Sequence, residues 1–203
     1  VSRVRELNER VNKIEINHKI VNFLTSNQLV IKTNNFDFKE IEIKVINVES
    51  KNLAKQFLQS FHYAQFGRSA KLIFGAYLKD ELIAVCKFST PIRQEVATSL
   101  NYQYSEVLEL DRFCIHPAYH KKNFASWFIS RCSKLIDSKK IRCLVSFADS
   151  TYGHLGTIYK AANWQEIGKI RPDYYYVNEE GFILHKKTLY NQAVKMGKIE
   201  SEY

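Results

Sequence analysis

The feature that most constrains the fold is a run between residues 106 and 147, in which a strand, a polar loop, a long helix and a second strand follow one another. Residues 106–115 are largely apolar, and residues 141–147 are apolar apart from one arginine. The helix predicted from Asn123, which can cap it, to about Ser138 has a single apolar stripe. The stripe consists of Phe124, Trp127, Phe128, Cys132, Leu135 and Ile136. Because a strand–helix–strand crossover within one sheet is almost always right-handed, the run predicts a parallel βαβ unit.

The rest of the chain supplies further strands. Alternating residues predict a strand from Ile41 to about residue 48, and Ser50 is placed to cap a helix over 52–61 with Leu53, Phe57 and Leu58 inward. Strands over 71–78 and 81–89 are separated by two residues only and predict a hairpin, and a second hairpin pairs 174–177 with 182–186. The order β-α-β-β-β-α-β-α-β-β predicts an α/β (α+β) fold with a mixed sheet and helices on its faces.

A candidate reaction centre lies between residues 145 and 168. The strand there ends on Asp149, a polar loop follows, and a short helix is predicted from His154 to about Ala162, with Leu155, Ile158 and Tyr159 on one face. Asn163 is suited to closing that helix in the left-handed conformation, and Trp164 is predicted to open another strand. An acid delivered to the carboxyl edge of a sheet fits a reaction centre, and the same pattern also fits an ordinary connection. Spacing alone leaves both open.

Three regions follow from composition along the chain. Residues 1–35 form a predicted helical N-terminal extension that ends in a polar, Asn-rich stretch, residues 36–190 form the catalytic domain, and residues 191–203 form a basic C-terminal tail. The extension carries no chemical motif, and its alternatives are a dimerisation arm, which would make a homodimer, and a substrate-binding arm.

The charge balance favours an anionic partner. The 30 Lys and Arg residues exceed the 21 Asp and Glu residues, which gives a formal net charge of +9. Such an excess fits nucleic acid or an anionic cofactor, and it also fits plain solubility. The four cysteines have no C-x-x-C spacing and lie in apolar runs, so we expect reduced core thiols in a cytoplasmic protein. No apolar run approaches the ~18 residues of a membrane span, so no membrane partner is expected.

The run from Leu110 to Ser126 resembles the GNAT acyltransferase superfamily, and the resemblance extends from about residue 41 to about residue 186. In that family the corresponding loop and helix start hold the pyrophosphate of acyl-CoA, since amides and the dipole at a helix N-terminus attract phosphate. The resemblance implies a GNAT-like fold with acyl-CoA (acetyl-CoA) as a cofactor. The residues it implies for the cofactor are His120, Lys121, Lys122, Asn123, Phe124 and Ala125. The family pattern has glycines where this chain has Asn123 and Ala125, which weakens the inference of CoA binding. Tyr159 stands where many of these enzymes keep an acid.

Four pieces together resemble the Mom family, phage and bacterial enzymes that modify adenine in DNA. The pieces are residues 61–63, 71–77, 123–128, and the stretch with Ala148-Asp149 and Gly153-His154-x-Gly156-x-Ile158-Tyr159-x-Ala161. The resemblance implies conversion of adenine to an N6-carbamoylmethyl derivative that protects DNA from restriction. It also implies that His62, Tyr63, Ser126 and Asp149 are catalytic.

These residue types suit a transfer to an exocyclic amine. Asp149 or His62 would act as base or acceptor, and Tyr63 or Ser126 would donate to a developing oxyanion. Acting on duplex DNA also requires taking the base out of the stack. The candidates for contacting double-stranded DNA are Arg68, Tyr152, Lys169, Arg171, Tyr174, Lys186 and Lys187. His62 and Asp149 are also metal-binding types, but no third ligand has a diagnostic spacing, so we expect no metal.

Three functions are therefore weighed. The first is a Mom-type DNA-modifying enzyme, and the second is an acetyl-CoA-dependent N-acyltransferase that acts on a protein or a small amine. The third is a catalytically dead GNAT-like module that binds nucleic acid through a basic face. Loss of Asp149 distinguishes the dead module from the two enzymes, because only the dead module would tolerate it.

Overall fold

The computed structural model describes residues 35–47, 50–62, 64–149, 153–170, 176–177, 183–184 and 186–197. The chain forms two compact units, one of residues 28–166 and one that combines residues 1–27 with 167–203. The predicted helical extension over 1–35 lies outside the described residues except for residue 35.

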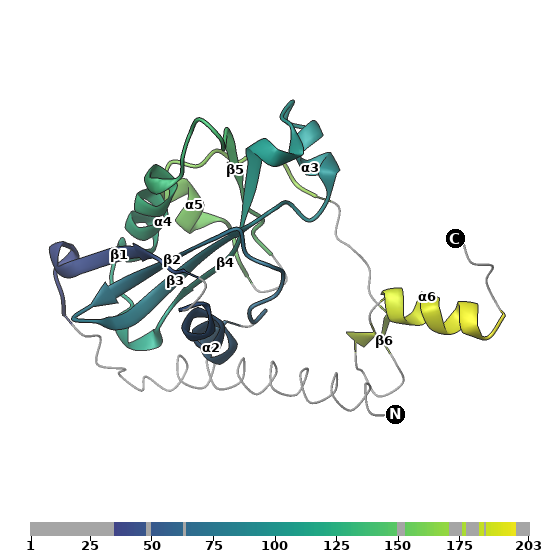
Figure 1. Cartoon of the computed structure of the whole chain (residues 1–203), viewed down its shortest axis with the longest axis horizontal. Coiled ribbons are helices and arrows are strands. Elements are labelled where there is room, and N and C mark those ends of the chain that lie inside the picture. The colour runs from purple at the N-terminus through teal and green to yellow at the C-terminus, as the bar shows by residue number, and fades with distance from the viewer. Residues whose placement is uncertain are drawn as a thin grey trace. The chain divides into compact units, whose positions relative to one another are not determined.

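A five-stranded sheet organises the first unit, in the order β1-β2-β3-β4-β5 (Figure 1). Its strands are β1 (Ile41–Val45), β2 (Leu72–Leu78), β3 (Glu81–Ser89), β4 (Val107–Ile115) and β5 (Cys143–Val145). Neighbours from β1 to β4 are antiparallel, whereas β4 and β5 are parallel. The predicted mixed sheet is confirmed, and so is the hairpin, since Lys79 (φ 49°) and Asp80 (φ 68°) take the left-handed conformation of a two-residue turn.

Helices cover both faces of this sheet (Figure 1). Helix α2 (Lys51–Phe61) packs its Phe57 and Leu58 against Ile73 and Val85. The helix of the predicted crossover is α4 (Phe124–Leu135), which buries Phe128 in the main core beside α5 (Thr157–Ala161). Short 3₁₀ turns are η1 (Phe38–Glu40), η2 (Tyr104–Glu106) and η3 (Pro117–Tyr119). The connection from β3 to β4 contains α3 (Gln94–Thr98).

Three predicted inward leucines are wrong. Leu53 is 47% exposed because it precedes Ala54 and so lies about 100° around α2 from that buried residue. Leu135 is 57% exposed because it is the last residue of α4, and the extended Ile136 takes the buried place. Leu155 is 76% exposed because Gly156 (φ 71°) delays the start of α5 to Thr157, so Leu155 lies outside the helix.

The predicted helix caps also differ in detail. Ser50 and Asn123 occupy the N-cap positions of α2 and α4, but neither side chain makes a cap hydrogen bond. Asn163 (φ 62°) closes α5 in the left-handed conformation, as predicted. Trp164 does not open a strand, because its N–H donates to the carbonyl of Tyr159 and its ring lies 5.7 Å from the Tyr159 ring.

In its described residues, the second unit contains a small hairpin and one helix. Strands β6 (Tyr176–Val177) and β7 (Ile183–Leu184) pair antiparallel, which confirms the predicted pairing. Helix α6 (Lys186–Lys195) begins at Lys186, which was predicted to end the second strand. The four cysteines are free, as expected. None of the helices in the described ranges is long and apolar enough to cross a membrane.

Candidate active site

An irregularity in β4 sets the geometry of the site. Lys87 pairs with Arg112 and Phe88 pairs with Leu110, so Asp111 is an extra residue in β4. A bulge of this kind turns consecutive side chains to one face of a sheet. It brings Asp111 and Arg112 together on the face that α2 covers, where a regular strand would separate them.

Charged side chains meet beneath this bulge, and we call them the ion network: Arg68, Lys87, Glu109, Asp111 and Arg112. The Nζ of Lys87, 0% exposed, donates to both carboxylate oxygens of Asp111 at 2.8 and 2.7 Å, and to Ser89 Oγ at 3.0 Å. Burial lowers the pKa of Lys87, and the hydrogen bond to Asp111 raises it. Arg68 donates to Glu109 at 2.6 Å and to the carbonyl of Thr90 at 2.8 Å. Buried charges are thus paired and hydrogen-bonded, as a low-dielectric interior requires.

Arg112 fixes the loop that follows α2. Its Nε donates to the carbonyl of Gln65 at 2.7 Å, and its Nη2 donates to the carbonyl of Ala64 at 3.2 Å. Gly67 (φ 66°) allows this approach, because a Cβ there would lie 2.1 Å from the Arg112 Nη2. The loop over 64–67 is therefore held against β4 by one guanidinium.

Replacing Gly67 should release this loop. We expect Gly67→Ala to cost more than the ~1–2 kcal/mol of a left-handed alanine, because the new Cβ also displaces Arg112. Gly153→Ala is a matched control: Gly153 (φ 72°) has the same conformation, and a Cβ there meets nothing within 4 Å. Urea unfolding of both variants measures the difference, and equal losses would show that the contact with Arg112 contributes nothing.

His62 lies at the end of α2, next to this loop. Its Nδ1 accepts a hydrogen bond from the Ala64 N–H at 3.0 Å. Burial lowers its pKa to about 3, with smaller contributions from the charges of Arg112, His154 and Lys87. In a neutral imidazole whose Nδ1 accepts, the proton is on Nε2. His62 therefore carries its ring proton on Nε2, and its suggested roles as base and as acceptor stay predictions.

This shift in pKa predicts acid sensitivity. The folded-state pKa of about 3 lies below the ordinary 6.5, so between these values the unfolded chain binds a proton that the folded chain does not. The contribution of His62 to the free energy of unfolding is therefore fully present above pH 6.5 and falls by up to about 1.4 kcal/mol per pH unit below it. Asn at position 62 keeps an acceptor for the Ala64 N–H but does not titrate. Urea unfolding at pH 7 and pH 5 should show the wild type losing up to about 2 kcal/mol relative to His62→Asn. If the free energies of unfolding of the wild type and His62→Asn change in parallel with pH, the lowered pKa of His62 is contradicted.

Asp149 reaches the same edge of the sheet from β5. The strand ends at Val145, four residues before Asp149, whose side chain is exposed. The Asp149 carbonyl accepts the His154 N–H at 3.2 Å, and the charge of His154 acts on His62. Asp149 is thus linked by a backbone hydrogen bond to the residue whose charge acts on His62. Helix α5 starts only at Thr157 and has five residues, so its N-terminus begins eight positions after Asp149.

Tyr159 lies where β4 and β5 separate. Their pairing ends at Glu109 and Val145, although β4 continues to Ile115. Ser146 Oγ donates to the carbonyl of Leu110 at 2.9 Å. Burial raises the pKa of Tyr159, while the hydroxyl of Ser146 acts to lower it, so the Tyr159 hydroxyl stays protonated and can donate a hydrogen bond.

The expected cofactor loop keeps a suitable backbone, while some of its side chains are engaged elsewhere. Asn123 (φ 67°) adopts the left-handed conformation that a glycine would favour. Lys121 Nζ donates to the carbonyl of Phe36 and lies over the Phe36 and Phe38 rings. Phe124 is buried in the core, whereas His120 and Lys122 are exposed. Ser126 Oγ donates to the carbonyl of Asn123 at 3.1 Å, the structural role open to it in a first helical turn.

The candidates for contacting DNA belong to both units. Arg68 belongs to the ion network, Lys169 is exposed in the second unit, and Lys186 and Lys187 begin α6. Tyr63, Tyr152, Arg171 and Tyr174 lie outside the described residues.

Sequence reasoning missed Lys87, Asp111 and Arg112 as part of the site. The signal available was their position: each is a charged residue inside an otherwise apolar strand of the sheet. Lys and Asp are almost never fully buried unless they are paired, so a charge in a central strand indicates a partner across the sheet.

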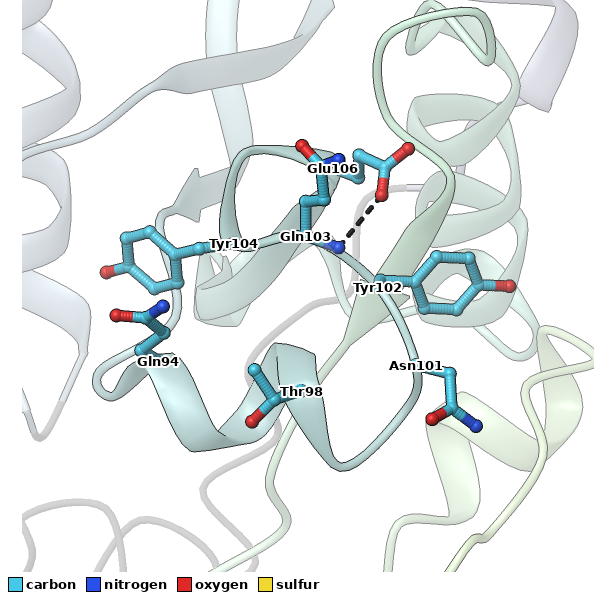
Figure 2. Close-up of a pocket in the computed structure, with 7 residues that line it drawn as sticks. All are labelled: Gln94, Thr98, Asn101, Tyr102, Gln103, Tyr104 and Glu106. Atoms are coloured by element: carbon cyan, nitrogen blue, oxygen red, sulfur yellow. Dashed lines mark hydrogen bonds between the residues drawn. The ribbon is translucent and has the colours of Figure 1, made fainter.

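A polar pocket lies apart from these residues, on the connection between β3 and β4. Figure 2 shows the Tyr102 and Tyr104 rings on opposite sides of it, with the Gln103 N–H donating to Glu106 at 2.8 Å. Its lining consists of Gln94, Thr98, Asn101, Tyr102, Gln103, Tyr104 and Glu106. None of the predicted site residues lines it. Within the described ranges no three potential metal-binding side chains (His, Cys, Asp or Glu) gather into a metal site.

Comparison with known proteins shows similarity in sequence to one protein family and similarity in fold to a group of solved structures. A model of the Mom protein family matches residues 41–203. The methylcarbamoylase Mom of Escherichia phage Mu is 27% identical over 167 residues, which are 78% of this chain and 65% of that protein, so the chain spans about two thirds of this relative. Crystal structures of an aminoglycoside acetyltransferase from an uncultured soil metagenomic sample superpose with TM-scores of 0.50 (with sisomicin) and 0.51 (with trehalose). They are 9% and 10% identical, covering 69% and 70% of this chain and 98% and 99% of theirs, and they share the GNAT acetyltransferase fold.

Proposed function

Because the chain belongs to the Mom protein family, we propose that it is a DNA-modifying transferase that converts adenine to its N6-carbamoylmethyl derivative and so protects DNA from restriction. The observation that carries the proposal is the match of the family model to residues 41–203. The backbone hydrogen bond from His154 to Asp149 beyond the end of β5, and the effect of the His154 charge on His62, support a site there. The 27% identity to the phage Mu methylcarbamoylase supports the same reaction.

The two predicted catalytic side chains take different roles in this proposal. As the new N6–carbon bond forms, the bond between the carbamoylmethyl group and its donor breaks, and the donor's leaving group departs with that electron pair. The amine loses a proton, and the exposed carboxylate of Asp149 accepts it. The Nε2–H of His62 donates to an oxygen of the transferred group, because this imidazole is neutral and its Nδ1 is engaged. The ion network holds the loop beside His62 and fixes the direction of that donor.

Duplex DNA is the proposed partner, and the net charge of +9 supports it. Each phosphate neutralised by a Lys or Arg releases counterions, so affinity for duplex DNA should fall steeply as salt rises. Fluorescence anisotropy with a labelled duplex at low and high salt measures this dependence. Binding that is absent at low salt, or that does not change with salt, contradicts the proposal of a phosphate-contacting face.

The decisive experiment is nucleoside mass analysis of DNA from cells that express this chain. An adenine nucleoside heavier by a carbamoylmethyl group, absent from empty-vector cells, is the expected result. Unmodified DNA from cells that contain folded protein would reject the proposed reaction. If that protein still bound DNA, the chain would instead be a nucleic-acid-binding module without catalytic activity.

A second candidate is an acyl-CoA-dependent N-acyltransferase that acts on a protein or a small amine. The separation of β4 from β5 beyond Glu109 and Val145 favours it, together with the left-handed Asn123 before α4. The first-turn amides of Ala125 and Ser126 would hold the pyrophosphate, and the bound thioester would supply an activated acyl group. Calorimetry with acetyl-CoA tests this, and no binding at millimolar ligand removes CoA as the donor.

A further inference from the structure

Leu155 is an apolar side chain with no place in the core. It is 76% exposed, the largest value among the exposed large apolar side chains of the described residues. A leucine left in water forgoes the stabilisation that burial of its side chain would give. Single exposed leucines are common on protein surfaces, so exposure alone indicates nothing. The position of Leu155 within the fold is what suggests a function for it.

Leu155 stands at the tip of a short, anchored projection. Gly153 (φ 72°) and Gly156 (φ 71°) both take the left-handed conformation and flank His154 and Leu155. A Cβ at Gly153 would meet nothing within 4 Å, whereas a Cβ at Gly156 would lie 3.7 Å from the Ala148 Cβ. The projection is thus open on one side and packed against the end of the β5 segment on the other.

The projection belongs to the candidate site. The residue before Leu155 donates its N–H to the carbonyl of Asp149 at 3.2 Å, and its charge lowers the pKa of His62. Phe147, two residues before Asp149, is also 41% exposed. Apolar surface therefore lies directly beside the groups proposed to act on adenine.

An adenine within a duplex cannot reach a catalytic carboxylate while it is stacked. Extruding it breaks its stacking and pairing and leaves a gap in the helix. Proteins that open base steps commonly insert a Phe, Leu, Ile, Met or Pro side chain there, because an apolar wedge replaces the lost stacking contacts. The enzyme then needs such a side chain next to its active site, exposed before DNA binds.

We propose that Leu155 is this wedge, and that it enters the base stack as the target adenine leaves it. The proposal rests on the proposed function, since it assigns an element for opening duplex DNA to the same site. A branched apolar side chain on a firmly anchored tip fills the gap and keeps the adenine from returning. Leu155 acts on the DNA and not on the reacting atoms.

Base extrusion is measured without any donor, using duplexes with 2-aminopurine at one adenine in each combination of flanking bases. Wild-type protein should raise the 2-aminopurine fluorescence in at least one context, and Leu155→Ala should reduce that rise at least about tenfold at saturating protein, since unstacking costs a few kcal/mol. Leu135→Ala is the matched control, because Leu135 is an exposed leucine at the far end of α4. A normal rise with Leu155→Ala, or no rise with the wild type, overturns the proposal.

The second readout separates a wedge from a merely structural leucine. A target base opposite an abasic site has already lost its pairing, so its extrusion needs less help. On that duplex, the fluorescence rise with Leu155→Ala should be smaller than the rise with the wild type by less than about threefold. An equal deficit on both duplexes overturns the proposal and makes Leu155 structural. Failure of the proposed reaction has a different signature, namely DNA without modified adenine in the mass analysis, whatever the fluorescence shows.

Discussion

Asp149→Asn should leave a folded protein that binds DNA and produces no modified adenine. The amide keeps the shape of the carboxylate and the backbone carbonyl that accepts the His154 N–H at 3.2 Å. It removes the charge and the basicity, and a positioned base is typically worth about 10²–10⁴ in rate. Nucleoside mass analysis of DNA from expressing cells measures the loss, and circular dichroism confirms the fold.

A structural role for Asp149 predicts something else. An acid that only satisfies loop N–H groups would lower stability by about 0.5–2 kcal/mol when it is removed, and modification would continue. Asp137→Asn is the matched control, because Asp137 accepts the Lys139 N–H at 3.0 Å in an exposed turn. Near-normal modification by Asp149→Asn would take Asp149 out of the proposed mechanism.

Asp111→Leu should be the most destabilising single change in the ion network. It leaves the fully buried ammonium of Lys87 without its carboxylate partner, and with Ser89 Oγ 3.0 Å away and the centre of the Phe66 ring 5.1 Å away. Breaking a buried pair by removing one partner typically costs about 3–5 kcal/mol, because an uncompensated charge remains. Urea unfolding of the variant and the wild type measures the loss.

The double variant Lys87→Met/Asp111→Leu tests the cause of that loss. Replacing a buried ion pair by apolar residues of similar volume is often neutral or stabilising, so we expect the double variant to recover most of the stability. The recovery of stability is limited by Arg112, whose charge also loses Asp111 as a partner, since its Nη1 lies 3.9 Å from Asp111 Oδ2. A double variant as unstable as Asp111→Leu would show that shape, and not charge, makes the pair necessary.

The sequence predicts the framework of this protein well where periodicity is continuous. The hairpin of β2 and β3, the parallel crossover through α4 and the mixed sheet all follow from apolar patterns and a two-residue turn. Element ends are less predictable because one backbone conformation decides them. Gly156 in the left-handed region moves the start of α5 by three residues, and that shift alone changes Leu155 from a predicted helix-face residue to an exposed tip.

The candidate site was predictable only in part. A likeness to a family indicated His62 and Asp149, and the structure brings their segments together through His154. The bulge in β4 was not predictable, because the alternation of residues 107–115 does not show where a strand gains an extra residue. In a regular strand Asp111 and Arg112 would face opposite sides of the sheet, so the ion network cannot be predicted from the sequence.

The ion network also bears on the order in which the molecule folds. Its hydrogen bonds join distant parts of the chain, with sequence separations of 24 for Lys87 and Asp111, 41 for Arg68 and Glu109, and 47 for Arg112 and Gln65. Closing loops of this length costs entropy before any contact compensates for it, so the strand pairing of β3 with β4 must come first. The loop beside His62 then docks after the folding transition state, and changes in it should speed unfolding more than they slow folding.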